Sequence, residues 1–497
     1  MKKAGNEGKE QRIRIININR CEPEHIDNFR SFTMKKGILM LAALGLVLGL
    51  AIPSYSAVQN VKVGGDFTIY GAFRHDFSFS KLYKNNDFLQ SSVRVWVSSD
   101  LSNNVSTMVR IINERDWGQS ITGFAPSSNG NITLDLAYVK LADLFTPGLN
   151  ATIGRQDLKI GEGLVIGSQY NALNYGAVAS LLAPDLGLQQ SFDAIKLNYA
   201  TPIIPLSAQG FFSKVQESST AFLTSPAATP NDINLYGLSV LYAPSNWSLE
   251  PYIVNEYNYG NTTLGVVPAS NSSITTAGLR GTLTVPAVQN LSFKAEYGKQ
   301  FGKDETTAGH PSYEGWAGYV GGKYVFSTPM KPFISAKYSI YSGADAVGGK
   351  VKSWQPMFPS GLANNFGSIG YPAVWTLLYG GSSFGLGPTI YTAPYFPGVK
   401  VAKLGVGFQP LQRLGVYLNY FDLSLDTRLA ATGFGAASSE SVGSEVDLGL
   451  NYAYSDDVAF GVTIGQLYRG GFIKDYLGKG TTTEDPWQAL ASMTVSF

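Results

Sequence analysis

His75 and His310 are the residues of this sequence best suited to general base catalysis, because the remaining histidine lies upstream of a predicted signal peptide. A hydrolase of the serine or cysteine type needs such a base beside its nucleophile. His75 shares its parity with Phe73 and Phe77, His310 is followed by Pro311, and neither has a Ser or Asp at a spacing typical of membrane hydrolases. Acidic pairs such as Asp456-Asp457 lack the ligand density of a calcium site. We therefore expect no enzymatic activity, no metal site and no cofactor.

Charged residues recur instead at alternate positions between apolar ones, as Arg94 does between Val93 and Val95. A charge on the lipid-facing side of a membrane strand is costly, so this pattern predicts charged side chains that face an aqueous lumen. Mixed charges in a pore set a transverse field and a weak ion preference. The predicted pore-lining residues are Arg94, Arg110, Arg155, Asp157, Lys159, Lys196, Arg280, Lys294, Glu296, Lys337, Lys403, Glu445 and Asp447.

The elements that carry these charges are predicted to be membrane-spanning strands. In the closing segment Trp487–Phe497, Trp, Ala, Ala, Met, Val and Phe occupy the odd positions and mostly small polar residues the even ones. Side chains alternate between the two faces of a strand, and about nine to eleven tilted residues cross a bilayer. Counting similar segments predicts an all-β, transmembrane, antiparallel up-and-down β-barrel of about 18 strands.

The predicted connections between strands alternate strictly in length. Short links such as 100–104 and 455–457 fall between longer segments such as 161–190 and 342–400. A bacterial barrel has short periplasmic turns, long extracellular loops and both termini on the periplasmic side. Aromatic residues also gather beside the short links, as expected of an interfacial girdle. These residues are Tyr199, Tyr242, Trp247, Tyr324, Phe326, Phe333, Phe408, Tyr452, Tyr454 and Phe460.

The N-terminal region is predicted to be absent from the working protein. Lys35 and Lys36 precede an apolar run, and Ser54-Tyr55-Ser56 supplies small residues for a cleavage site, so residues 34–56 are expected to be a signal peptide. Residues 1–33, which contain the single cysteine Cys21, are then a non-native or leader extension, and residues 57–497 form the barrel. Removing nine basic and five acidic residues leaves 28 basic and 31 acidic, a formal net charge near −3. No basic stripe with interleaved aromatics appears, which argues against nucleic acid as a partner.

The alternation changes parity in one segment, between Ile153 and Leu158. A bulge near Gly154 would produce the shift and would aim Arg155, Asp157 and Lys159 into the pore, although a bulge can also simply adjust curvature. The long segment Ser342–Lys400 is open to two interpretations. It could fold inward as a constriction or form an ordered external loop on the rim.

Two short motifs resemble those of the alginate-export family of outer-membrane barrels. They are Gly154-Arg155-Gln156 with Gly161-Glu162-Gly163, and Gly443-Ser444-Glu445-Val446-Asp447 followed by Asn451-Tyr452. The resemblance implies an 18-stranded barrel that conducts a polysaccharide or a smaller hydrophilic solute, with Arg155, Glu445 and Asp447 at matching positions. Exporters of anionic polymers would have a predominantly basic pore, whereas the lining inferred from the alternation is of mixed sign.

Two functions therefore remain open. The first is a porin-like channel in the cell outer membrane for passive passage of small hydrophilic or anionic solutes, including saccharides or polysaccharide. The second is a structural or adhesive barrel with a closed lumen and partner-binding external loops. The expected partners of either barrel are outer-membrane lipid and lipopolysaccharide, with the barrel-assembly machinery recognising the terminal Phe497.

Overall fold

A computed structural model describes residues 59–76, 85–118, 132–167, 186–188, 191–217, 232–259, 271–305, 309–343, 349–358, 398–428, 439–477 and 484–497. The predicted signal peptide and the preceding extension lie outside these residues. The first nine strands are β1 (Gln59–His75), β2 (Asn85–Ser102), β3 (Val105–Asp116), β4 (Ile132–Leu141), β5 (Leu149–Gln156), β6 (Phe192–Ala200), β7 (Leu206–Gln216), β8 (Asp232–Tyr242) and β9 (Trp247–Tyr259). The others are β10 (Ser272–Thr284), β11 (Leu291–Asp304), β12 (Ser312–Tyr313), β13 (Trp316–Val325), β14 (Phe333–Tyr341), β15 (Lys350–Val351), β16 (Val399–Leu411), β17 (Leu414–Ser424), β18 (Ser441–Ala453), β19 (Val458–Arg469) and β20 (Trp487–Ser496).

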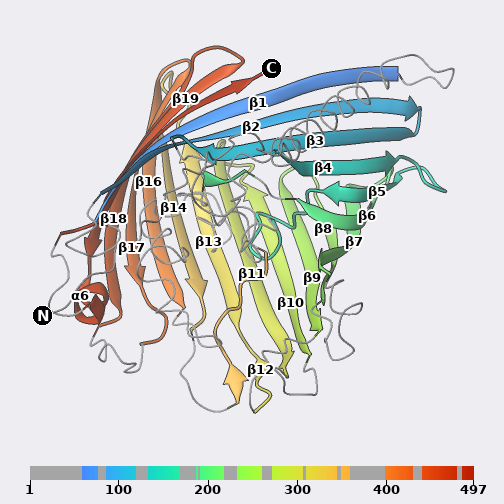
Figure 1. Cartoon of the computed structure of the whole chain (residues 1–497). Coiled ribbons are helices and arrows are strands. Elements are labelled where there is room, and N and C mark those ends of the chain that lie inside the picture. Colours follow the sequence, from blue (N-terminus) through green and yellow to red (C-terminus); the bar gives the residue numbers. More distant parts are fainter. Residues whose placement is uncertain are drawn as a thin grey trace, which may run out of the picture. The chain divides into compact units, whose positions relative to one another are not determined.

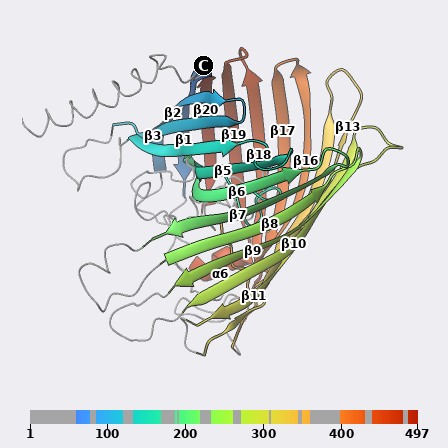
Figure 2. The ribbon, with the colours of Figure 1, turned by 90° about the vertical axis from the view of Figure 1, so that its right-hand side faces the viewer.

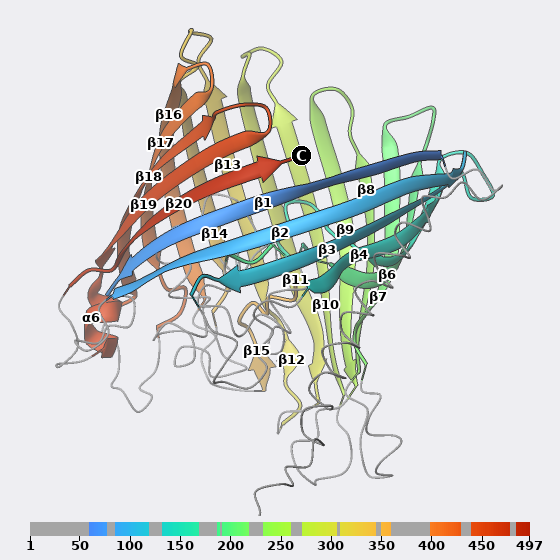
Figure 3. The same cartoon turned by 45° about the horizontal axis from the view of Figure 1, so that its top comes forward.

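These strands form one closed sheet, shown in Figure 1. Two of the twenty, β12 and β15, are two residues long and lie in connecting segments, which leaves eighteen long strands. Each long strand pairs antiparallel with its neighbours along the chain, and Figure 2 shows β7 to β11 side by side in this order. β20 pairs with β1 and closes the cylinder, as Figure 3 shows. The predicted 18-stranded antiparallel barrel is confirmed.

The alternation of short and long connections is also confirmed. Tight hairpins join β2 to β3, β4 to β5 and the corresponding later pairs, while the connections between those hairpins are long. Both termini of the barrel lie at the hairpin end, because Gln59 pairs with Asp100 and Gly65 exchanges backbone hydrogen bonds with the terminal Phe497. Below, "turn side" denotes this end of the barrel and "loop side" the opposite end.

The two faces of the wall have the predicted polarity. Leu448 and Leu450 are 40% and 37% exposed, whereas Glu445 and Asp447 on the same strand are 0% and 3% exposed. Apolar side chains that are exposed in the isolated chain cover the outer face, where lipid contact removes them from water. Most of the predicted girdle shares this face, but Phe333 lies on the inner face beneath the ammonium group of Lys323, 4.3 Å from the ring centroid.

The predicted bulge is in a different place. β5 pairs without a register shift with β4 as far as Arg155 and with β6 as far as Gln156, so the prediction of a bulge near Gly154 is wrong. The parity changes after Gln156 because the chain leaves the sheet there. A register shift does occur in the β3–β4 pair, where Arg110 is opposite Leu136, Ile111 is opposite Leu134, and no residue of β3 is opposite Asp135. This extra residue moves Leu136 to the buried side, although the simple alternation places it with Leu134 on the outer face.

A short helix, α6 (Gly471–Leu477), lies between β19 and β20. Within the part of the chain that the structure describes, no helix has the length and apolar character needed to cross a bilayer.

Candidate functional site

Part of the inner wall is apolar, which the alternation alone does not explain. Phe192, Phe211, Leu235, Val254 and Ile274, from β6 to β10, are all at most 8% exposed and belong to one hydrophobic cluster. Phe192, Leu235 and Ile274 lie at or near the loop-side ends of their strands, and Phe211 and Val254 lie closer to mid-strand. Buried apolar residues on the wall of a water-filled lumen need a partner that covers them. Two segments that leave the sheet supply this cover.

The first insert (residues 157–167) follows β5, and the second insert (residues 349–358) contains β15. The first contributes Leu158, Ile160, Leu164, Val165 and Ile166 to the cluster, and the second contributes Trp354, Met357 and Phe358. The inserts bond to one another: the amide of Phe358 donates to the carbonyl of Val165 at 2.9 Å, and the amide of Gly167 donates to the carbonyl of Phe358 at 2.7 Å. They therefore form one packed unit against the inner wall.

Each insert is also tied to the wall by polar contacts. Gln209 of β7 donates to the carbonyl of Lys159 at 3.0 Å, and Gln300 of β11 donates to the carbonyl of Gln355 at 2.6 Å. On the far side of the first insert, Lys294 of β11 donates to the carboxylate of Glu162 at 2.8 and 2.9 Å. The first insert thus reaches from β7 to β11 across the inside of the cylinder. The prediction that the chain forms an external loop from Gly161 is wrong for residues 161–167.

The described part of the Ser342–Lys400 segment supports the inward alternative, because residues 349–358 pack inside the barrel. Residues 359–397 lie outside the described residues.

Glu162 is held by the cations of the wall. Burial alone would raise the pKa of its carboxyl group, but the hydrogen bond from Lys294 and the nearby positive charges of Lys294, Lys337 and Arg280 outweigh it and lower the pKa below its usual value. The guanidinium group of Arg280 lies 4.0 Å from Glu162 and 3.4 Å from Glu250 of β9. Glu162 is therefore ionised at neutral pH and fixes the first insert to the basic side of the wall.

A cavity of about 680 Å³ lies on the inner wall from β10 to β19. Its charged lining residues are Lys294, Lys323, Lys337, Lys403 and Asp447, four cations and one anion, with a formal net charge of +3. Aromatic rings support several of these lysines: Lys337 lies over Tyr319 at 4.2 Å and Lys403 over Phe421 at 5.6 Å from the ring centroid. We call this cavity the basic vestibule. It lies towards the turn side, since its lining includes Thr284, Ser292 and Phe333 beside the hairpins.

Three other predicted residues have side-chain partners. Arg94 bonds Asp66 at 2.9 and 3.0 Å, and Arg110 bonds Asp135 at 2.6 Å. Glu296 accepts hydrogen bonds from the hydroxyl groups of Tyr252 at 2.9 Å and Tyr319 at 3.0 Å. These acids contact arginine or tyrosine and do not line the vestibule, whose charged lining consists of four lysines and Asp447.

Arg155 is on the opposite face from the one predicted. By strand register it shares the face of Ile153, which is 46% exposed, and its guanidinium group lies 3.7 Å from the carboxylate of Asp193. The expectation of a pore-facing Arg155 rested on the bulge and is wrong because β5 continues in register. Asp157 and Lys159 lie in the first insert with exposed side chains, and Lys196 donates to the carbonyl of Asp157 at 3.1 Å.

Sequence reasoning did not select Glu162 and Lys323 as site residues. Glu162 lies in a quoted motif, between Gly161 and Gly163, but nothing in the local sequence shows that this turn enters the lumen. Lys323 follows Gly321-Gly322 near a hairpin, and strand alternation alone could have placed it on the inner face with Lys337.

A protein-family profile described as alginate export matches residues 59–483. Among solved structures, Acinetobacter baumannii OccAB3 aligns with a TM-score of 0.53 and 10% identity over 88% of this chain and 99% of that chain. A. baumannii OccAB2 aligns with a TM-score of 0.51 and 11% identity over 89% and 99% of the two chains. Pseudomonas aeruginosa OccK11 (OpdR) has a TM-score of 0.50 and 11% identity over 89% and 97%. At 10–11% identity, these similarities are evidence of a shared fold alone. No curated protein matches the sequence.

Proposed function

This chain belongs to the alginate export family of outer-membrane β-barrels, and from that premise we propose that it is a passive channel for anionic hydrophilic solutes, with anionic saccharides as the substrate class. The observation that carries the proposal is the basic vestibule, whose charged lining residues give a formal net charge of +3. Hydroxyl and amide side chains, including Ser335, Asn419 and Asn451, share this lining and are suited to hydrogen bonding with sugars.

The arrangement of the lumen suggests a division of roles. The basic vestibule on the turn side raises the local concentration of an anionic solute by Coulomb attraction. The two inserts on the loop side narrow the path and set the size limit. Lysine ammonium groups are flexible point charges, so they attract successive carboxylates of a sliding chain without the fixed bidentate geometry of arginine. Such weak, repeated contacts allow a solute to enter and also to leave.

A bilayer experiment tests the proposal. The purified protein is inserted into a planar bilayer, and current is measured while a uronate oligosaccharide, or a neutral oligosaccharide of equal length, is added to the turn side. We expect discrete ion-permeable openings that the anionic sugar interrupts at a concentration at least about tenfold lower than the neutral one, which corresponds to about 1.4 kcal/mol. Equal potency of the two sugars would refute the anionic preference.

The rival function, a structural or adhesive barrel with a closed lumen, is favoured by one observation, the packed inserts that cross the lumen. The same recording separates the two functions. Folded protein that inserts but shows no conductance would support the closed barrel and would overturn the channel.

A further inference from the structure

A cluster of potential metal ligands lies where the barrel closes. His75 is the last residue of β1, Asp76 follows it, and Glu484 lies just before β20. β1 and β20 are the first and last strands of the cylinder, and their pairing extends from Asp66 opposite Ser496 to His75 opposite Trp487. The cluster therefore stands at the loop-side end of the closing seam.

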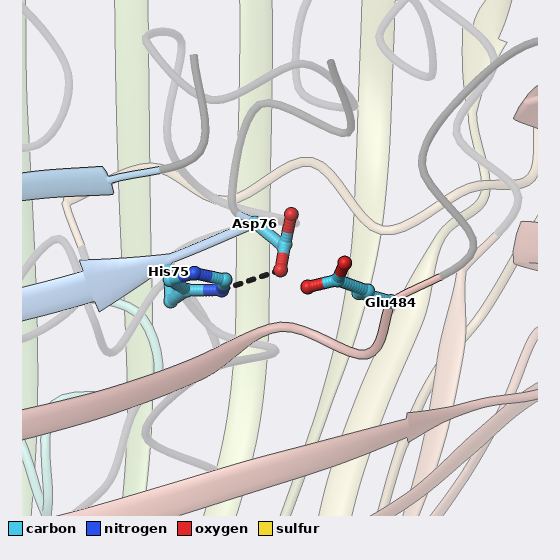
Figure 4. Close-up of side chains that lie close together, drawn as sticks. All are labelled: His75, Asp76 and Glu484. Atoms are coloured by element: carbon cyan, nitrogen blue, oxygen red, sulfur yellow. Dashed lines mark ion pairs between the residues drawn. The ribbon is translucent and has the colours of Figure 1, made fainter. Parts of the chain in front are cut away.

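The three side chains converge from the two sides of this seam. One ligand atom from each of His75, Asp76 and Glu484 lies within 4.8 Å of the others, and Figure 4 shows the Glu484 carboxylate pointing towards Asp76. Nδ1 of His75 contacts Oδ2 of Asp76, whose side chain is fully buried. The His75 ring is stacked on Trp487, with centroids 5.8 Å apart and an interplanar angle of 15°. Two of the three ligands are thus already held in place.

The composition of the cluster indicates which ion it fits. Ligands bound to one zinc ion at about 2.0 to 2.2 Å are separated by about 3 to 4 Å, so only a small adjustment would close this set around an ion. An imidazole nitrogen with two carboxylate oxygens suits a first-row transition ion, whereas calcium and magnesium prefer oxygen ligands alone. A divalent cation between the two carboxylates would also reduce their mutual repulsion.

We propose that His75, Asp76 and Glu484 bind one divalent transition-metal ion, of which Zn²⁺ is the best match, and that this ion links the loop-side ends of β1 and β20. Three protein ligands leave one coordination position for water. The ion would join the loop-side ends of the first and last strands of the barrel, β1 and β20, which pair with each other. If the ion binds the folded barrel and not the unfolded chain, the free energy of unfolding rises with the logarithm of the ion concentration once that concentration exceeds the dissociation constant.

The test uses tag-free, folded barrel and Zn²⁺ as the probe. Equilibrium dialysis and calorimetry give stoichiometry and affinity for the wild type, His75→Phe and Glu484→Gln. Phenylalanine retains a ring that can stack on Trp487 but has no nitrogen ligand, and glutamine retains the shape of glutamate without its charge. His310→Phe and Glu305→Gln are matched controls, because both are exposed residues of the described chain outside the cluster.

We expect one Zn²⁺ per wild-type chain, a dissociation constant at least about tenfold higher in each cluster variant, and no change in the controls. Zn²⁺ should also raise the temperature at which the folded band is lost in heated gel electrophoresis, for the wild type but not for His75→Phe. Absence of stoichiometric binding to folded wild type, or equal weakening in the controls, would overturn the site. Tighter binding of Ca²⁺ than of Zn²⁺ would overturn its assignment to a transition metal.

Discussion

Removing three lysines of the basic vestibule should abolish the anion preference of the channel. The triple variant Lys323→Gln, Lys337→Gln, Lys403→Gln retains Lys294 and Asp447, so the formal charge of the lining falls from +3 to 0. Glutamine keeps a polar side chain of intermediate length, and the outer face of the barrel is unchanged. The substitutions therefore alter the field in the lumen more than the fold.

The size of the effect follows from the cavity. A sphere of 680 Å³ has a radius of about 5.5 Å, so a charge set back in the wall lies about 8 Å from a solute at the centre. At that distance each net charge contributes about 0.5 kcal/mol in water, or about 0.2 kcal/mol after screening at about 0.1 M salt. Three net charges give about 0.7 kcal/mol, which enriches a monovalent anion about threefold and depletes a cation about threefold. The expected permeability ratio is therefore about ten in the wild type and about one in the variant.

Reversal potentials across a bilayer with a potassium chloride gradient measure this ratio. The matched control replaces three exposed cations outside the vestibule, Lys331, Arg413 and Lys474, by glutamine, which lowers the net charge of the protein equally. The control should keep the wild-type ratio. If the vestibule variant also keeps it, the lysines do not govern permeation and the reasoning is refuted.

Three further outcomes are expected. Gly443→Ala should lower the free energy of unfolding by at least about 1 kcal/mol, seen as loss of the folded band on heated gels, because Gly443 has a φ of 136° and an added Cβ would lie 2.0 Å from a backbone oxygen. Gly415→Ala should have a small effect, because an added Cβ there would lie 4.0 Å from the nearest atom. The lowered pKa of Glu162 keeps its ion pair intact at neutral pH and above, and protonation below the ordinary carboxyl range breaks the pair; anion selectivity should therefore rise as pH falls in the wild type, but not in Glu162→Gln. Phe358→Ala should loosen the two inserts, at a cost of about 3 kcal/mol, and should increase single-channel conductance, while Phe408→Ala on the outer face should not; unchanged conductance in both would show that the inserts do not narrow the path.

The strands could be predicted from sequence because lipid and water impose a local rule. Leu448 and Leu450 alternate with small, polar or charged residues, so a few neighbouring positions are enough to predict which side chains face lipid. The rule fails at Leu136 because Asp135 is an extra residue in its strand pairing, and a single inserted residue changes the face of every residue that follows. Arg155 was assigned to the wrong face for a related reason, because the prediction assumed an inserted residue near Gly154 that the strand pairing does not contain.

The inserts and the cluster of His75, Asp76 and Glu484 could not be predicted because they depend on contacts between residues distant in sequence. Ile166 and Phe358 meet inside the barrel although nothing in either local sequence shows that its segment enters the lumen. Apolar residues at inward-facing positions, such as Phe211 and Leu235, could have indicated the inserts, because apolar side chains on the wall of a water-filled lumen need a segment that covers them. His75 and Glu484 lie near opposite ends of the barrel sequence and come together only because β20 pairs with β1.

The central claim is that the lysines face an aqueous path while the neighbouring apolar residues face lipid. Cysteine accessibility tests this claim most directly. The sequence contains one cysteine, Cys21, so Lys337→Cys and Leu404→Cys in a Cys21→Ser background each provide a single reactive thiol. A charged, water-soluble thiol reagent should modify Lys337→Cys and reduce its single-channel current, and should leave the current of Leu404→Cys unchanged. Block through Leu404→Cys, with Lys337→Cys unaffected, would contradict the assignment of the two faces.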